Sequence, residues 1–299
     1  MIVECVPNFS EGRDPVIVAS IARAVSSVPG VLLLDTTSDP DHNRSVLTFA
    51  GAPQAVADAA MAAVHAAIGK IDLSRHAGVH PRLGAADVIP FVPVDSVTLE
   101  QCAGFAREVA AQIWNELHVP VYLYESAALR PECKRLENVR KLAPAGLPPD
   151  FGEGRHPTAG ASVVGARKFL VAWNINLRTS NLTAAREIAR AIRESSGGLP
   201  AVKAIGLPLK SRDQVQVSIN LVDFERTPLY VVFDAVKRFC EERNIEIAGS
   251  ELIGMIPAAA LAGSRDHDLQ WENLRPELIL EHQLREAGML SGPRQHPES

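Results

Sequence analysis

The pattern of apolar and polar residues in the first half of the chain predicts alternating strands and helices. Short apolar runs bounded by turn residues predict strands, and apolar residues spaced three or four apart predict helices. We expect strands at Ile2–Pro7, Val31–Asp35, Arg44–Phe49, Val88–Val94 and Val121–Tyr124, and helices at residues 15–28, 53–69 and 98–118. This order is β-α-β-β-α-β with an additional helix and strand, which is the split βαβ arrangement.

Two of these helices begin with capping residues. Asp14 directly precedes Pro15, which combines an N-cap side chain with proline at the first helical position. Thr98 and Gln101 have the spacing of a capping box, in which each side chain bonds the other residue's backbone N–H. We therefore expect helices to begin immediately after Asp14 and Thr98.

Three stretches of the first half depart from the pattern. Asn8–Gly12 is polar and predicts a loop. Pro90 and Pro93 lack an N–H group, so they predict that the strand Val88–Val94 is irregular or lies at an edge. Leu129–His156 mixes basic residues with proline and glycine, which predicts a connection or a functional loop.

The same order of elements repeats in the second half. We expect strands at Phe169–Leu177, Ala201–Leu207, Val215–Leu221 and Ile245–Ala248, and helices at Thr183–Ser195, Thr227–Phe239, Ile256–Leu261 and Glu277–Arg285. The sequence predicts an α+β protein of two subdomains with split βαβ (ferredoxin-like, βαββαβ) topology, packed around a ligand cleft. We place them at residues 1–167 and 168–287, and we expect residues 288–299, which have no core pattern, to be disordered.

Composition and charge narrow the class of partner. Of 299 residues, 46% are hydrophobic and 22% charged, which is ordinary for a protein with large cores. The net charge of -5 gives no basic surface for nucleic acid. No apolar run reaches the roughly 18 residues of a membrane span, and the first residues do not form a signal peptide. Four widely spaced cysteines without a CxxC pair indicate a reducing compartment, so we expect a cytoplasmic protein with no membrane partner.

His80 is the first candidate for catalysis. It lies in Gly78–Val94, which has the sequence GVHPRLGAADVIPFVPV, and proline and glycine restrict the backbone around it. Histidine titrates near neutral pH, so one imidazole can accept and release a proton within a catalytic cycle. The alternative role is a capping or core histidine.

Two other histidines offer different chemistry. His76 and His80 have the His-x3-His spacing of two metal ligands on a helix, but Gly78 and Pro81 make this segment a poor helix. No third ligand has a fixed place, so we expect no metal. His42 lies in a turn rich in aspartate and asparagine, where a solvated loop is the alternative.

Four charged residues are candidates for binding a carboxylate or a cationic group. Arg44 and Arg82 are candidate carboxylate ligands, because a guanidinium group forms two parallel hydrogen bonds to a carboxylate. Asp39 and Asp87 are candidates for orienting an imidazole or stabilising a cation, and capping is the alternative for both. Three polar residues after the first strand are equally consistent with ligand binding or loop structure: Asn8, Ser10 and Glu11.

The segment Asp150–Arg167 carries four glycines and Pro157. Glycine permits close approach of the backbone to a flat ligand. The segment matches neither of the glycine-rich phosphate-binding patterns, GxxxxGK[ST] and GxGxxG. A flexible linker is the alternative.

Seven motifs, in order along nearly the whole chain, resemble those of glutamate formimidoyltransferases, the folate-dependent enzymes of histidine breakdown. They are ECVPNFSEGR (Glu4–Arg13), NRSV (Asn43–Val46), SRHAGVHPRLGAADVIPFVPV (Ser74–Val94), VPVYLYE (Val119–Glu125), DFG (Asp150–Gly152), GARKFLVAWNINL (Gly165–Leu177) and SELIGMIP (Ser250–Pro257). The resemblance implies N- and C-terminal formiminotransferase subdomains, a homodimer, and ligands in the groove between the subdomains.

The resemblance also implies roles for particular residues. His80 matches the catalytic histidine of the family's HPR motif, and the folate-contacting loop matches the segment between the DFG and GARKF motifs. The residues of this loop are Gly152, Glu153, Gly154, Arg155, His156, Pro157, Thr158, Ala159 and Gly160. The loop is shorter than in the animal enzymes, and this chain stops before their cyclodeaminase domain, so we expect a separate protein to deaminate the product.

The implied reaction moves a formimidoyl group between N-formimidoyl-L-glutamate and N5 of tetrahydrofolate. N5 loses a proton and the glutamate nitrogen gains one, and a single neutral histidine can carry out both steps. On this hypothesis Asp39 stabilises the cationic amidine, and Arg44 and Arg82 bind the glutamate carboxylates. The sequence also permits a folate-dependent glutamate formyltransferase of the same fold, a metal-dependent hydrolase using His76 and His80, and a folate carrier without catalysis.

Overall fold

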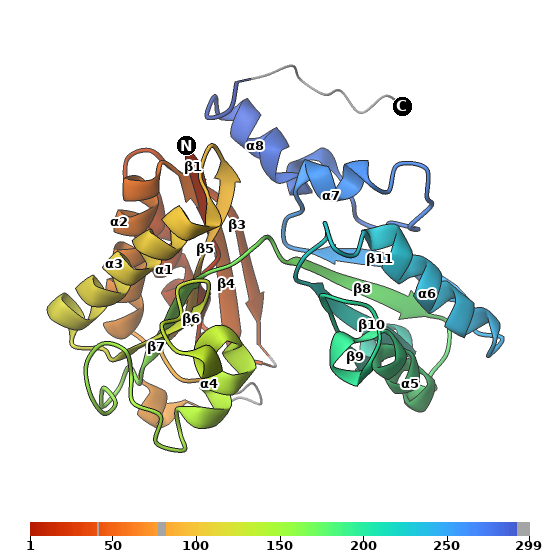
Figure 1. Ribbon diagram of the computed structural model, residues 1–299, viewed down its shortest axis with the longest axis horizontal. Helices are drawn as coiled ribbons and strands as arrows, with labels where there is room; N and C mark the ends of the chain where they lie inside the picture. The colour runs from red at the N-terminus through yellow and green to blue at the C-terminus, as the bar shows by residue number, and fades with distance from the viewer. Residues whose placement is uncertain (41, 77–81, 292–299) are drawn as a thin grey trace. The chain divides into compact units, whose positions relative to one another are not determined.

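The computed structural model describes residues 1–40, 42–76 and 82–291, and it divides into two compact units (Figure 1). Unit 1 is Met1–Arg167 and unit 2 is Lys168–Ser299. Each unit combines helices with a β-sheet, so the predicted α+β class is confirmed.

Unit 1 contains a seven-stranded mixed sheet. Its strands are β1 (Ile2–Cys5), β2 (Asn8–Phe9), β3 (Val31–Asp39), β4 (Arg44–Gly51), β5 (Ala86–Asp95), β6 (Val121–Glu125) and β7 (Ser162–Ala166). β3 pairs with β4, and β1 and β2 lie one after the other between β4 and β5. β7 lies between β5 and β6 and is parallel to both.

Helices cover both faces of part of this sheet. The longer helices are α1 (Pro15–Ser26), α2 (Pro53–Ile68) and α3 (Leu99–Leu117), and a short helix, α4 (Leu136–Leu142), follows β6. The three longer helices bury their apolar faces in one core with the sheet. The other core includes Val88, Val163 and Val139, so α4 packs on the opposite face of β5 and β7.

The capping residues of unit 1 act as predicted. The Asp14 carboxylate accepts hydrogen bonds from the N–H groups of Val16 and Ile17 at the start of α1. Thr98 and Gln101 form both hydrogen bonds of the capping box at the start of α3. These local signals therefore position two helix starts without help from tertiary contacts.

Two expectations for unit 1 are wrong, and a third is confirmed in one of its alternatives. Asn8 belongs to β2 rather than to a loop. β5 is an interior strand and not an edge strand, but its pairing with β1 and with β2 is irregular, with a shift of register in each, as the prolines predicted. Residues 129–167 contain α4 and β7, whereas the sequence predicted only a connection and a glycine-rich loop.

Unit 2 contains a four-stranded antiparallel sheet in the order β11-β8-β10-β9. Its strands are β8 (Val171–Leu177), β9 (Val202–Leu209), β10 (Gln214–Leu221) and β11 (Ile247–Ile253). Its helices are α5 (Leu182–Ile192), α6 (Leu229–Glu241), α7 (Ala258–Ala262) and α8 (Leu280–Glu286). Residues 288–291 follow α8, and the remainder of the predicted disordered tail lies outside the described residues.

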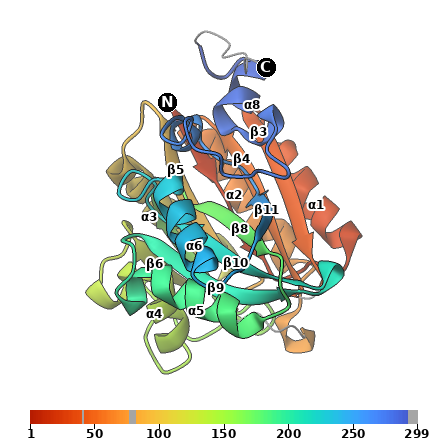
Figure 2. The same ribbon diagram turned by 90° about the vertical axis from the view of Figure 1, so that its right-hand side faces the viewer.

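The two faces of this second sheet differ in chemistry. Helices α5 and α6 lie on one face (Figure 2), where alternate strand residues such as Trp173, Ile175 and Val217 form an apolar core. The intervening residues, which include Asn174 and Asn176, lie on the other face. The other face is therefore mixed: it carries the polar residues of β8 and β10, together with apolar residues of β9 and β11 such as Ile205 and Ile253.

All four cysteines are free and buried. Cys102 and Cys240 lie on the buried faces of α3 and α6. Burial raises the pKa of each of these two thiols to about 11. Among the described residues, no helix has the length and apolar composition needed to cross a membrane.

Candidate functional site

His80 and its neighbours in residues 77–81 lie outside the described residues. The residues on either side of this segment are described. His76 follows the short 3₁₀ helix η1 (Leu73–Arg75), and Arg82 leads into β5. The contacts of His76 and Arg82 therefore show what surrounds the two ends of the segment that carries His80.

Arg82 connects both ends of that segment to the turn between β3 and β4. Its Nη1 donates to the carbonyl of Asn43 at 3.0 Å, and its Nη2 donates to the carbonyl of His42 at 2.9 Å. Nη1 also lies 2.6 Å from Nε2 of His76. Burial, and then the nearby Arg82 charge, lower the pKa of His76, which favours a neutral imidazole able to accept from the guanidinium.

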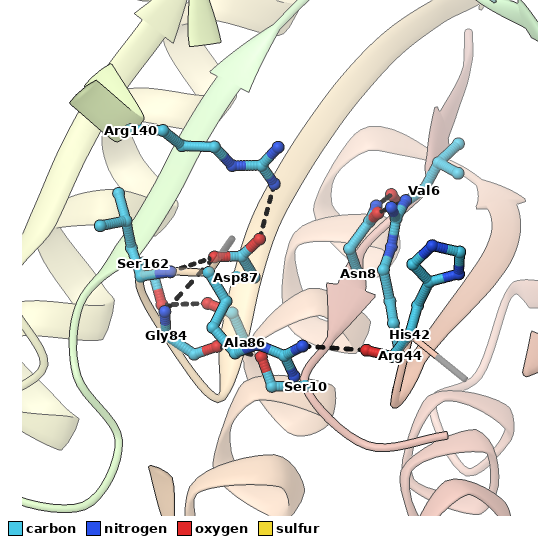
Figure 3. A network of polar contacts seen from close by, with 12 residues as sticks. Val6, Asn8, Ser10, His42, Arg44, Gly84, Ala86, Asp87, Arg140 and Ser162 are labelled. Carbon is cyan, nitrogen blue, oxygen red and sulfur yellow. Dashed lines mark hydrogen bonds and ion pairs between the residues drawn. The ribbon is translucent and has the colours of Figure 1, made fainter. Parts of the chain in front are cut away.

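Arg44 is the first residue of β4, and its side chain contacts Asn8 Oδ1 on β2 (Figure 3). Asn8 Nδ2 in turn donates to the carbonyl of Val6 at 2.9 Å. Burial, and then the nearby Arg140, lower the pKa of Arg44. A partly desolvated guanidinium beside another cation favours the binding of an anionic ligand.

Asp39, at the end of β3, contacts a histidine other than His80. Its Oδ1 accepts from the backbone N–H of His42 at 2.9 Å, and its Oδ2 lies 2.5 Å from His42 Nδ1. The two side chains are 49% and 47% exposed. Asp39 therefore orients an imidazole that is open to solvent.

Asp87 is a buried residue at the start of β5, and its carboxylate binds neighbouring backbone groups. Its Oδ1 accepts from Leu83 N at 2.6 Å and from Gly84 N at 3.3 Å. Its Oδ2 forms an ion pair of 2.7 Å with Arg140 on α4 (Figure 3). The carboxylate thus fixes the backbone a few residues after His80, which is the capping alternative rather than the orientation of an imidazole.

Sequence reasoning missed Arg140. Only 4% of the Asp87 side chain is exposed, so this ion pair is a buried link between α4 and the start of β5. The sequence did contain a local indication of this helix, because Leu136 and Val139 have the three-residue spacing of an amphipathic helix. In the structure both residues pack into the adjacent core. That spacing places Arg140 beside the apolar contacts and within reach of the sheet.

The loop after β2 has structural contacts of its own. Ser10 Oγ donates to the carbonyl of Gly84 at 2.7 Å, and Gly12 N donates to Asn43 Oδ1 at 2.9 Å. Glu11 accepts from the N–H groups of Arg13 and Asp14. The loop is therefore attached to both the β3–β4 turn and the segment that precedes β5.

The loop that the motifs match to folate contact, residues 152–160, also borders that segment. Gly160 makes two backbone hydrogen bonds with His156, and His156 Nδ1 accepts from the N–H groups of Thr158 and Ala159. Gly160 has a φ of +72°, and a Cβ there would lie 2.2 Å from the carbonyl oxygen of Leu83. The His156 side chain thus stabilises the turn of the loop, and Gly160 allows the loop to lie directly against Leu83.

The exposed part of this loop comprises Glu153, Gly154, Arg155 and Pro157. Arg155 Nη2 donates to the carbonyl of Leu83 at 3.4 Å, whereas Ala159 and Gly160 are buried against the segment before β5. Unit 1 therefore brings together Arg44, Arg82, Asp87, Arg140 and this loop around the described residues that flank His80. Within the described part of the chain, no group of three or more histidine, cysteine or acidic side chains has metal-binding geometry.

These features define an α+β protein in which arginine and aspartate side chains form a hydrogen-bonded network around the residues that flank His80. The chain belongs to the formiminotransferase family: residues 2–167 match the formiminotransferase domain, N-terminal subdomain, and residues 172–287 match the formiminotransferase domain. The family resemblance predicted from the motifs is thus confirmed.

Similar proteins include two of nearly the same length. Glutamate formimidoyltransferase of Streptococcus pyogenes serotype M1 is 44% identical over 282 residues, which cover 91% of this chain and 94% of that protein. Glutamate formimidoyltransferase of Thermoplasma acidophilum is 41% identical over 297 residues, covering 96% and 98%. Formimidoyltransferase-cyclodeaminase of Mus musculus is 44% identical over 276 residues, covering 87% of this chain and 51% of the mouse protein.

Proposed function

We propose that this protein is a glutamate formimidoyltransferase, which transfers the formimidoyl group between N-formimidoyl-L-glutamate and N5 of tetrahydrofolate. The observation that carries the proposal is the similarity, over almost the entire length of both chains, to two proteins named for this activity. The cationic site of unit 1 supports it, because glutamate presents two carboxylates that require positive partners.

In the proposed reaction N5 of tetrahydrofolate attacks the amidine carbon and forms a tetrahedral adduct. The bond from that carbon to the glutamate nitrogen then breaks, so N5 loses one proton and the glutamate nitrogen gains one. We assign this transfer to His80 as general base and then general acid. Binding both substrates beside this residue removes much of the entropic barrier of the bimolecular step.

Arg44 is our first candidate for a substrate carboxylate, since it is desolvated and lies near a second cation, Arg140. Arg82 is the second candidate, although its guanidinium also holds the carbonyls of His42 and Asn43. We assign Asp39 to the cationic amidine, because its carboxylate is half exposed beside the turn that Arg82 holds. The exposed residues of the loop 152–160 are proposed to contact tetrahydrofolate.

The test is a transfer assay with two donors. Purified protein is incubated with tetrahydrofolate and either N-formimidoyl-L-glutamate or N-formyl-L-glutamate, and the consumption of tetrahydrofolate is followed. We expect rapid consumption with the formimidoyl donor and little with the formyl donor. The reverse preference would establish a formyltransferase of the same fold.

The same assay distinguishes the enzyme from a folate carrier and from a metal-dependent hydrolase. A carrier would bind tetrahydrofolate without consuming the formimidoyl donor. A hydrolase using His76 and His80 would release glutamate without tetrahydrofolate and would retain a stoichiometric ion through dialysis. The position of Arg82 Nη1, 2.6 Å from His76, argues against the hydrolase, because a guanidinium repels a metal ion at that imidazole. The homodimer and the cytoplasmic location remain predictions.

A further inference from the structure

The loop 152–160 begins at the edge of the unit 1 sheet. Asp150 N and Phe151 N donate to the carbonyl of Val121 on β6 at 2.8 and 3.1 Å, and Val121 N donates to the carbonyl of Phe151 at 2.9 Å. β6 is the last strand on this side of the sheet, so residues 150–151 extend the sheet by one short antiparallel bridge. The chain therefore enters the loop directly from the sheet.

The Asp150 carboxylate adds a side-chain contact at this point. Its Oδ2 accepts from Leu123 N on β6 at 2.8 Å and from Nη2 of Arg130 at 3.0 Å. Only 6% of the Asp150 side chain and 24% of the Arg130 side chain are exposed. Burial opposes the charge of Arg130, but the hydrogen bond to Asp150 and its negative charge outweigh burial, so the pKa of Arg130 is raised. Solvent screens such a pair only weakly, so Arg130 restrains the residue from which the loop starts.

The two ends of the loop lie against the rest of unit 1, and the part between them is open to solvent. At Gly152 the backbone has a φ of +83°, and a Cβ there would lie 2.4 Å from the ring of Trp114 on α3. At the other end, Ala85 N donates to the carbonyl of Ala159 at 2.9 Å. Residues 153–155, between these ends, are exposed. The restraints on the two ends therefore determine where the exposed residues lie.

We propose that Arg130 is a positioning residue for tetrahydrofolate, which acts through Asp150 to hold the start of the loop 152–160 in the conformation that the ligand contacts. This proposal rests on the proposed function. A loop that is already restrained loses less conformational entropy when a ligand binds to it. Arg130 reaches Asp150 through Nη2, and a single N–H···O contact of this kind is one that a lysine ammonium can also make.

The first test is the substitution Arg130→Met in the full chain. We expect the Kd for tetrahydrofolate, and its KM in the transfer assay, to rise about tenfold, as for the loss of one hydrogen bond to a charged group. We expect kcat and the KM for N-formimidoyl-L-glutamate to stay within about twofold of wild type, because the loss concerns binding of one substrate. Arg130→Lys should recover most of the affinity. If Arg130→Met does not fold, Asp150→Asn takes its place, since it keeps an acceptor for Leu123 N and removes the charge.

The second test needs no ligand and measures how firmly the loop is held. Arg155 is exposed within the loop, so trypsin can cleave the chain after it when the loop opens locally. We expect Arg130→Met to raise the rate of this cleavage about tenfold, because the rate follows the population of the open loop. Mass spectrometry of the fragments identifies the cleavage at Arg155 among the other sites.

Two control variants separate this role from a general loss of stability. Arg135→Met removes an exposed charge from the connection that carries Arg130. Tyr122→Phe removes the hydrogen bond of 3.0 Å from the Tyr122 hydroxyl to the carbonyl of Leu147, so it should lower the melting temperature. Both controls should leave the tetrahydrofolate Kd and the cleavage at Arg155 within about twofold of wild type.

The outcomes distinguish this role from the activity. Wild-type affinity or a wild-type rate of cleavage in Arg130→Met would overturn the proposal, and so would equal changes in Tyr122→Phe. A wild type that binds no tetrahydrofolate would overturn the proposed function together with this role. A wild type that binds tetrahydrofolate but transfers no formimidoyl group would overturn the proposed function alone, because affinity and cleavage still test Arg130.

Discussion

The polar groups of the two units are satisfied in different ways. In unit 1, the charged side chains around the flanks of His80 bind the chain itself: Arg82 holds two carbonyls, and Asp87 holds two N–H groups and Arg140. In unit 2, Asn176 is equally buried but has no partner among the described residues. Unit 1 also contains buried atoms without a partner among the described residues, such as Arg140 Nε and Ser45 Oγ, so we infer only that the hydrogen bonds of Arg82 and Asp87 hold the flanks of the His80 segment in shape.

This difference assigns different experimental effects to the two regions. Substitutions in the network of unit 1 should lower the stability of the ligand-free protein. Replacing the buried Asn176 of unit 2 by an apolar residue of similar size should cost little stability, because its amide has no partner among the described residues. The predictions below concern unit 1 and begin with the largest effect.

The largest expected effect is that of His80→Ala on turnover. We expect kcat to fall by about 10²–10⁴, the range for a positioned proton carrier, with tetrahydrofolate affinity nearly unchanged. The control is His42→Ala, because His42 is the imidazole that Asp39 orients. We expect that variant to lose less than about tenfold in kcat. A greater loss in His42→Ala than in His80→Ala would transfer the catalytic role to the Asp39–His42 pair.

The second prediction concerns the ion pair between Asp87 and Arg140. Removing one partner of a buried pair costs about 3–5 kcal/mol, and we expect Arg140→Met to cost about 3 kcal/mol, because Arg140 is partly exposed and Asp87 keeps two N–H donors. Urea unfolding of the ligand-free protein measures this loss. Lys141→Met, an exposed site on the same helix, should change stability by less than about 0.5 kcal/mol. Equal stability of the two variants would show that unit 1 does not depend on this pair.

Features that depend on residues close together in the sequence were predicted correctly, whereas features that depend on distant residues were missed. Asp14 and Thr98 were assigned correctly as helix caps, because a cap involves only residues two or three positions away. β7 was missed, because its sequence, SVVGA, is short and becomes a strand by pairing with β5 and β6. Such pairing depends on tertiary contacts, which local propensity does not contain.

The same distinction applies to the candidate site. Arg44, Arg82 and Asp87 were selected by residue type, and the structure brings their charges close enough to interact in unit 1. Their partners were not predictable: Asp87 bonds Arg140, which is 53 residues further along the chain. Likewise, the sequence WNIN shows the alternation of a strand, but only the sheet register reveals that Asn176 lacks a partner among the described residues.

The third prediction tests how closely the loop 152–160 is held. Gly160→Ala places a Cβ 2.2 Å from the carbonyl oxygen of Leu83 at a positive φ, so we expect a loss of about 1–3 kcal/mol. Gly154→Ala is the matched control, since its φ is also positive but no atom lies within 4 Å of the added Cβ. It should cost about 1 kcal/mol. Thermal unfolding of both variants gives the comparison, and equal losses would show that the contact with Leu83 is unimportant.

The smallest expected effect is on the pH dependence of stability, through His76. Burial and Arg82 lower its pKa in the folded protein below the unfolded value of about 6.5. The neutral imidazole is therefore favoured by folding, so its contribution to the free energy of unfolding is present above about pH 6.5 and is lost as the pH falls through the folded pKa.

Urea unfolding of wild type and His76→Gln at pH 7.5 and pH 5.5 measures this contribution. We expect the wild type to lose more stability than the variant between these pH values, because protonation sets two cations against each other where Arg82 meets His76. An identical decrease in both proteins would mean that this contact does not help to hold the flanks of the His80 segment together, and the preformed character of unit 1 would then rest on Asp87 and Arg140.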